Sequence, residues 1–246
     1  YSMMQRATVS GQRILEVLDV PRATKDAPNA LDLEQCTGEV SFRHVDFAYV
    51  PGTPVLTEIN FAIRPGEKVA IVGPTGSGKS TIAALLRRFY DVNSGQVLID
   101  GHDVRDLSQA SIGMHVAMVL QDPFLFSGTI FDNIRYANSE KCASDIEAAA
   151  RAVGAHDFIM DLPGGYQFPL DQRGINLSRG QRQLLSFARA LVADTRILVL
   201  DEATANIDSY SEMKIQKALN RLLQGRTAIV IAHRLATIRE CDRILV

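Results

Sequence analysis

Three short runs of almost uninterrupted apolar residues stand out along the chain. They are Lys68 to Val72 (KVAIV), Ile197 to Leu200 (ILVL) and Thr227 to Ala232 (TAIVIA). Apolar runs of this length are typical of strands buried on both faces of a parallel sheet. We therefore expect these segments to form the centre of such a sheet.

Segments with helical periodicity lie between the apolar runs. Residues 79 to about 89 predict a helix directly after the first strand. Residues 209–223 predict another, because four apolar side chains fall at i, i+3, i+4 and i+7 on one helical face: Ile215, Ala218, Leu219 and Leu222. Alternating strands and helices predict an α/β fold with a parallel sheet and helices on both of its faces.

Two other regions have different patterns. Glu39 to Phe47 partly alternates apolar and polar residues, and Val55 to Ile63 and Gln96 to Ile99 are further strand candidates. These predict an antiparallel β subdomain packed at one side of the parallel sheet. Residues from about 122 to 193 are mostly helical in pattern and predict a helical subdomain.

Composition narrows the class of protein. The chain has 246 residues, a net charge of −2 and a hydrophobic fraction of 46%, which suits one large globular domain. Because no basic excess exists, nucleic acid is not an expected partner. The three cysteines include no CxxC pair, so neither a zinc site nor a disulfide framework is predicted. No apolar run of about 18 residues predicts a membrane span.

The two ends suggest a piece of a longer polypeptide. The chain begins with Tyr1 rather than Met and stops inside a strand-like run, Arg243 to Val246. Residues 5–19 predict a helix, and the polar segment from Pro21 to Asn29 reads as a linker.

A glycine-rich loop carries the clearest chemical signal. It matches the pattern G-x-x-x-x-G-K-[ST] in full, as Gly73, Pro74, Thr75, Gly76, Ser77, Gly78, Lys79 and Ser80. Such a loop wraps its backbone amides around a phosphate, while the lysine reaches the terminal phosphates and the hydroxyl ligates Mg²⁺. A flexible glycine-rich turn is the alternative, and the strand before and helix after the loop disfavour it.

Two carboxylates follow the strand at residues 197–200. Asp201 and Glu202 then lie at the carboxyl end of a strand, where open α/β sheets place their ligands. We expect Asp201 to hold Mg²⁺ and Glu202 to polarise an attacking water as general base. A solvated acidic strand end is the alternative.

Two further segments have weaker signals. His233 directly follows the strand at residues 227–232, where an imidazole could contact the terminal phosphate and hold the water and Glu202 in place. The run Leu177-Ser178-Arg179-Gly180-Gln181 opens a helix, at which Ser178 is a good N-cap. Plain capping and an anion site are equally compatible with that local sequence.

Taken together and in order, these motifs resemble the ABC ATPase family over residues 39–246. The resemblance rests on the phosphate loop, the LSRGQ segment about 100 residues later, the ILVLDE strand and the histidine. It implies a P-loop NTPase (RecA-like) core with an antiparallel β subdomain and a helical subdomain. It also implies ATP and Mg²⁺ as cofactors and ATP hydrolysis as the activity.

The resemblance assigns further roles. Tyr49 matches the aromatic residue that stacks on adenine, Thr81 belongs with the phosphate-loop residues, and Gln121 matches the glutamine that touches Mg²⁺ and the water. Ser178, Gly180 and Gln181 match signature residues that bind ATP held by a second domain, and Asp208 matches a loop that crosses the dimer interface. The implied catalytic set is Glu202, His233, Gln121 and Lys79, and the implied metal set is Ser80, Gln121 and Asp201.

The segment from Gln121 to Ile134 (QDPFLFSGTIFDNI) is similar to the exporter type, in which membrane and ATPase domains share one polypeptide. This implies that residues 1–30 link an upstream transmembrane domain to an ATP-binding domain at 31–246. The implied partners are that domain and a second ATP-binding domain, identical or different. The implied location is the cytoplasmic face of the cell membrane, as part of an integral membrane protein. The transported substrate is not implied.

Two positions depart from the family pattern. Arg179 replaces the usual third residue of LSGGQ, and Gln172 stands where the family often has a glutamate. These changes affect partner-facing contacts rather than the ATP chemistry within this chain. Three other functions agree less well with the sequence. An importer subunit disagrees with the QDPFLFSGTIFDNI segment, a DNA-repair ATPase lacks its coiled coil here, and a nucleotide sensor without hydrolysis disagrees with Glu202 and His233.

Overall fold

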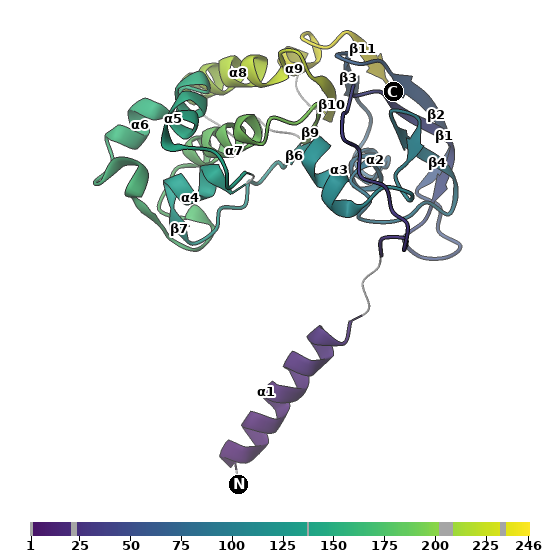
Figure 1. Cartoon of the computed structure of the whole chain (residues 1–246), viewed down its shortest axis with the longest axis horizontal. Coiled ribbons are helices and arrows are strands. Elements are labelled where there is room, and N and C mark those ends of the chain that lie inside the picture. The colour runs from purple at the N-terminus through teal and green to yellow at the C-terminus, as the bar shows by residue number, and fades with distance from the viewer. Residues whose placement is uncertain (1, 21–23, 137, 202–208, 232–234) are drawn as a thin grey trace.

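The computed structural model describes residues 2–20, 24–136, 138–201, 209–231 and 235–246. Figure 1 shows two packed parts of the chain and an N-terminal helix, α1 (Ser2–Leu18), that lies apart from both. One part holds most of the strands, and the other is mostly helical. Among the described residues, no helix combines the length and the apolar character that crossing a bilayer requires.

The central sheet has five strands, and every pairing in it is parallel. Its order is β11 (Arg243–Leu245), β3 (Lys68–Ile71), β10 (Thr227–Ile231), β9 (Ile197–Asp201) and β6 (Val116–Val119). Ile231 of β10 pairs with Ile71 on one side and with Asp201 on the other. The carboxyl ends of β3, β10 and β9 therefore meet at one edge of the sheet.

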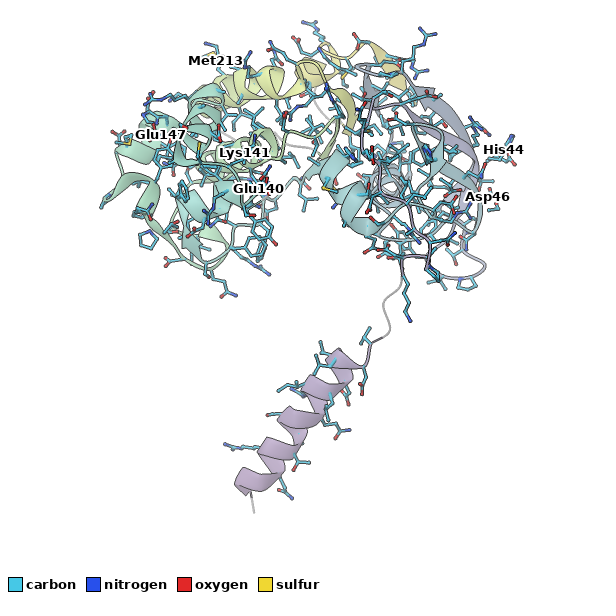
Figure 2. All side chains as sticks on the ribbon, in the orientation of Figure 1. His44, Asp46, Glu140, Lys141, Glu147 and Met213 are labelled. Atoms are coloured by element: carbon cyan, nitrogen blue, oxygen red, sulfur yellow. The ribbon has the colours of Figure 1, made fainter. Side chains whose placement is uncertain are left out.

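A second, antiparallel sheet lies beside the parallel one. Its order is β2 (Leu56–Ile63), β1 (Val40–Phe47), β4 (Ser94–Ile99) and β5 (His102–Asp103). The pairing is irregular near His44 and Glu58, whose backbones adopt positive φ. In Figure 2 the labels of His44 and Asp46 lie on this sheet, and Glu147 lies far from them in the helical part.

Two apolar cores share the parallel sheet. In β9, Leu198 and Leu200 pack with the helical part, whereas Ile197 and Val199 pack with the antiparallel sheet. The first face is covered by α7 (Arg179–Ala193) and α8 (Ser209–Leu223), and the second by α2 (Lys79–Leu86) and α3 (Gln109–His115). Burial on both faces explains why the interiors of β3, β9 and β10 are apolar.

The helical part contains more than helices. Besides α7 it holds α4 (Ile130–Arg135), α5 (Ala143–Ala152) and α6 (His156–Met160). It also contains 3-10 turns at Gly165–Gln167 and Gln172–Gly174 and a two-stranded ribbon, β7 (Gly128–Thr129) with β8 (Pro169–Leu170). The short helix α9 (Leu235–Ile238) precedes β11.

The predicted fold class is confirmed. The helix expected at 209–223 has those bounds in the structure, and the core strands agree to within one residue at each described end. The helix expected from Lys79 to about Phe89 ends earlier, at Leu86, because Arg88 adopts a left-handed φ of 52°. The segments α3 and β6 were not predicted.

Candidate nucleotide site

The phosphate loop connects β3 to α2 at the carboxyl edge of the parallel sheet. Lys79, the first residue of α2, is only 7% exposed. Its Nζ donates to the carbonyl oxygens of Gly73 at 2.9 Å and Pro74 at 2.7 Å, and lies 3.4 Å from Ser77 Oγ. The loop thus wraps around the ammonium group, which places a positive charge at the N-terminus of α2.

Gly78 shows why this loop needs glycine. It caps α2 with a left-handed backbone at φ 87°. A Cβ atom at this position would lie 2.5 Å from Leu56 Cδ2 and 3.2 Å from the carbonyl oxygen of Val55. Any other residue would therefore strain the backbone and collide with β2.

Ser80 and Asp201 meet across the sheet edge. The Ser80 hydroxyl donates to Asp201 Oδ2 at 3.3 Å, which joins the helix after the phosphate loop to the end of β9. A hydroxyl and a carboxylate are hard oxygen donors of the kind that Mg²⁺ prefers. The residues present therefore fit the metal that the sequence implied.

Gln121 lies at the same edge of the sheet. It follows β6, whose last residue, Val119, pairs with Leu200 of β9. Gln121 comes two residues after this pair and is exposed. The structure thus places Gln121 near the strand end that carries Asp201, and its contact with a metal or a water stays a prediction.

Tyr49 lies beside the start of the helix that follows the phosphate loop. Its hydroxyl lies 3.1 Å from Thr81 Oγ1, in the first turn of α2. The edges of Phe47 and Tyr90 orient the Tyr49 ring at centroid distances of 4.8 and 5.0 Å, both near 86°. The ring is 49% exposed, so a flat apolar face remains accessible beside the loop.

The signature segment opens α7 in the helical part. Ser178 Oγ accepts from the Gln181 backbone N–H at 3.2 Å, and Gln181 Oε1 accepts from the Ser178 N–H at 2.9 Å. This is a complete capping box. The capping interpretation is thus confirmed, while the nucleotide contacts of Ser178, Gly180 and Gln181 stay predictions.

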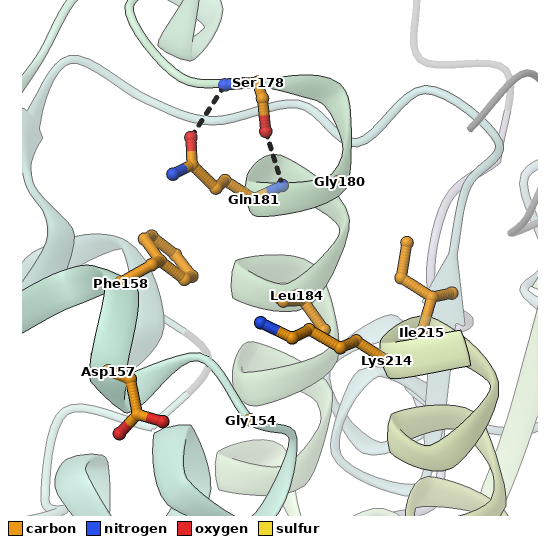
Figure 3. A pocket seen from close by; sticks show the side chains of 9 residues that line it. All are labelled: Gly154, Asp157, Phe158, Ser178, Gly180, Gln181, Leu184, Lys214 and Ile215. Atoms are coloured by element: carbon orange, nitrogen blue, oxygen red, sulfur yellow. Dashed lines mark hydrogen bonds between the residues drawn. The ribbon is translucent and has the colours of Figure 1, made fainter. Parts of the chain in front are cut away.

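A pocket of about 180 Å³ adjoins this capped helix start. Its walls come from the loop and helix at 154–158, the first two turns of α7, and α8. Figure 3 shows the Lys214 side chain from α8 extending into it, with Phe158 opposite and Asp157 below. The pocket therefore combines the polar helix start with one cationic and one anionic side chain.

Three predicted residues lie outside the described residues: Glu202, His233 and Asp208. Their positions in the sequence follow described strands, since Glu202 comes after Asp201 of β9, and His233 comes two residues after the end of β10. Their roles stay predictions.

Sequence reasoning missed the aromatic residues that hold Tyr49. Phe47 is separated from Tyr49 by one residue, but Tyr90 lies 41 positions further along, after α2. Alternation along β1 indicates Phe47 as buried. No local pattern connects Tyr90 to Tyr49, because only the fold brings the two together.

Comparison with known proteins agrees with this geometry. The family model described as "ABC transporter" matches residues 56–205. The chain is 50% identical over all 246 residues to the uncharacterized ABC transporter ATP-binding protein YknV of Bacillus subtilis, covering 41% of that protein. It is 44% identical over its full length to a fatty acid ABC transporter ATP-binding/permease protein of Mycobacterium tuberculosis, covering 39% of it.

A solved structure is also similar. A bacterial Atm1-family ABC exporter with ATP bound aligns with 98% of this chain at a TM-score of 0.88 and 38% identity. The chain covers 42% of that exporter chain. It thus spans about two-fifths of the length of each of these relatives.

Proposed function

This chain belongs to the ABC transporter family, and from that premise we propose that it is the ATP-hydrolysing motor domain of an exporter. Two such domains would close head to tail around two ATP molecules and drive substrate transport across a membrane. The names of its relatives, an ATP-binding/permease protein and an Atm1-family exporter, support the exporter type.

One observation carries the proposal. The hydroxyl after the phosphate loop and the carboxylate at the end of β9 lie 3.3 Å apart, between Ser80 and Asp201. A glycine-rich turn without a catalytic role has no need of an acidic strand end beside it. The pair supports a shared task for the two motifs, namely holding a metal–nucleotide complex.

Each side chain then has a defined part in binding. Lys79 presents its ammonium group to the terminal phosphates, and Tyr49 presents its exposed face to the adenine. Ser80, Gln121 and Asp201 are the residues that would hold Mg²⁺, which screens the phosphate charge when bound. Glu202 orients and deprotonates the attacking water, and His233 supports it.

The proposed partners follow from the second half of the site. Ser178 and Gly180 lie at the start of α7 in the helical part, and the nucleotide that they would serve is the one held by a second domain. Asp208 would cross that interface. Residues 1–30 would link a transmembrane domain of the same polypeptide to the ATP-binding domain at 31–246, with the helical subdomain at about 122–193. The domain would then work at the cytoplasmic face of the membrane.

Replacing Glu202 with Gln tests this function. The variant removes only the base, so we expect ATP affinity within about twofold of the unmodified protein and hydrolysis reduced about 100-fold or more. Size-exclusion chromatography with MgATP should show a trapped dimer. Glu240→Gln is the matched control, because Glu240 is an exposed carboxylate outside the site. Hydrolysis at the unmodified rate in Glu202→Gln would exclude the role given to this residue.

A further inference from the structure

Arg189 joins two elements that the proposed function assigns to different nucleotides. It lies on α7, whose first turn carries the signature residue Ser178 as its cap. Its guanidinium extends away from that helix to the segment at 121–126, which follows β6 and contains Gln121.

Three hydrogen bonds hold the guanidinium, one to the segment at 121–126 and two to Asn133 of α4. Arg189 donates from Nε to the carbonyl oxygen of Asn133 at 2.8 Å, and from a terminal nitrogen to the carbonyl oxygen of Phe124 at 3.0 Å. The other terminal nitrogen donates to Asn133 Oδ1 at 3.0 Å. The planar fork of an arginine can make these bonds at the same time, whereas a lysine cannot match their directions.

Asn133 extends the link. This side chain is 2% exposed, and its Oδ1 also accepts from the Phe126 N–H at 2.8 Å. Its Nδ2 donates to the carbonyl oxygens of Phe126 at 2.9 Å and Thr129 at 3.0 Å. The segment at 124–129 is therefore bound to α4 through Asn133 and to α7 through Arg189.

Two aromatic rings lie beside the charge. The Arg189 guanidinium lies 5.8 Å from the Phe126 ring centroid and 5.6 Å from that of Tyr136, and the two rings stack at 4.5 Å. Burial lowers the pKa of Arg189 below its ordinary value. A guanidinium nevertheless keeps its proton at every physiological pH. Arg189 therefore stays positively charged, and its hydrogen bonds do not act as a pH switch.

We infer that Arg189 is a positioning residue that makes the Gln121 segment and the signature helix move as one body. The inference rests on the proposed function. In that function Gln121 serves the nucleotide of its own domain, and Ser178 serves the nucleotide of the partner. Because Phe124 is three residues from Gln121 and is bonded to α7, a displacement of either site is carried to the other.

Arg189→Met tests the link, since Met keeps an apolar side chain but makes none of the three bonds. We expect the maximal ATPase rate to fall about ten- to a hundredfold, the cost of catalytic groups that are misplaced by about 1 Å. ATP affinity at the phosphate loop should stay within about twofold, because Arg189 touches neither Lys79 nor Tyr49. Arg189→Lys, which keeps the charge but loses the fork, should recover only part of the rate.

Arg226→Met is the matched control. Arg226 is a buried arginine that, like Arg189, holds α7, through the carbonyl oxygen of Ala190 at 3.1 Å and Asp194 Oδ1 at 3.2 Å. Within the part of the chain that the structure describes, its hydrogen bonds go to Ala190 and Asp194 and not to the segment at 121–126. Its loss should therefore lower stability without separating that segment from α7.

Spin labels at the exposed Asp122 and at Arg179 give a direct readout in the polypeptide that carries this domain. The distance distribution should be narrow in the unmodified protein and in Arg226→Met, and broad in Arg189→Met. If Arg189→Met showed a narrow distance distribution and an unchanged ATPase rate, the inference about Arg189 would be overturned and the proposed function would stand. An unmodified protein that fails to hydrolyse ATP would overturn the proposed function instead.

Discussion

The Ser80 hydroxyl donates to the Asp201 carboxylate at 3.3 Å, although 121 positions separate the two residues. The contact exists because β3 and β9 run parallel and end at one edge of the sheet. Replacing Asp201 with Asn should raise the Mg²⁺ concentration for half-maximal ATPase activity about tenfold or more, since a hard carboxylate becomes a neutral amide. A Mg²⁺ titration measures this.

Asp242→Asn is the control for that titration. Asp242 accepts from the Lys68 N–H at 2.8 Å at the opposite end of β3, so it resembles Asp201 in chemistry but not in place. If both variants show the Mg²⁺ dependence of the unmodified protein, Asp201 does not contribute to metal binding.

Replacing Lys79 with Ala should weaken ATP binding about ten- to a hundredfold, because it removes charge-assisted hydrogen bonds worth about 1.5–3 kcal/mol. A fluorescence titration with a nucleotide analogue measures the affinity. Lys141→Ala, in the helical part of Figure 2, removes a lysine far from the loop and should leave the affinity unchanged. Equal affinities in all three proteins would contradict the assignment of Lys79.

Tyr49 permits a separation of stacking from hydrogen bonding. Tyr49→Ala removes the exposed ring, so KM for ATP should rise about tenfold with a smaller change in kcat, as expected for the loss of a base–aromatic stack of about 1–3 kcal/mol. Tyr49→Phe loses only the contact with Thr81 and should stay within about threefold. A change in kcat with constant KM would argue against adenine stacking.

Ser178 has two roles that a matched variant can separate. Ser178→Ala should cost about 1 kcal/mol of stability, the usual loss for an N-cap, and should also lower the ATPase rate about tenfold because the partner's nucleotide loses a hydroxyl. Ser108→Ala removes the cap of α3, where Ser108 accepts from the Ser111 N–H. It should cost a similar amount of stability at full activity. Thermal unfolding and ATPase assays measure the two effects.

Asp100 makes the stability of the chain depend on pH. Burial acts to raise the pKa of its carboxyl, but hydrogen bonds from Thr37 and Glu39 outweigh burial and hold the pKa below its ordinary value. The ionised carboxylate accepts from the N–H groups of Thr37 at 2.6 Å, Gly38 at 3.1 Å and Glu39 at 2.7 Å. It thereby fixes the entry to β1.

Because the folded-state pKa is depressed, this stabilisation is complete above the unfolded-state pKa of about 3.9 and is lost as pH falls through the lower folded-state value. Asp100→Ala should reduce the free energy of unfolding by about 1–3 kcal/mol at pH 7. The difference from the unmodified protein should shrink below about pH 4. Urea unfolding at several pH values measures it, and a difference independent of pH would refute the explanation.

The sequence predicted best where one pattern dominates. The helix at 209–223 has four apolar residues on one face over two turns, and the interiors of β3, β9 and β10 are apolar. Prediction from the sequence failed at α3 and β6. These elements have seven and four residues, and without a strong hydrophobic periodicity such short segments resemble loops. The role of Arg189 was missed for another reason. The three atoms that accept its hydrogen bonds belong to Asn133 and Phe124, which lie 56 and 65 positions away in the sequence.

The place of β10 between β3 and β9 has a consequence for variants remote from the nucleotide. Neighbouring strands lie about 4.8 Å apart, so one intervening strand fixes the two functional strand ends about 10 Å from each other. Ala228 and Val230 of β10 pack against the helical core. Enlarging Ala228 would push the helices outward and change this separation, which would slow catalysis while every polar group kept its chemistry.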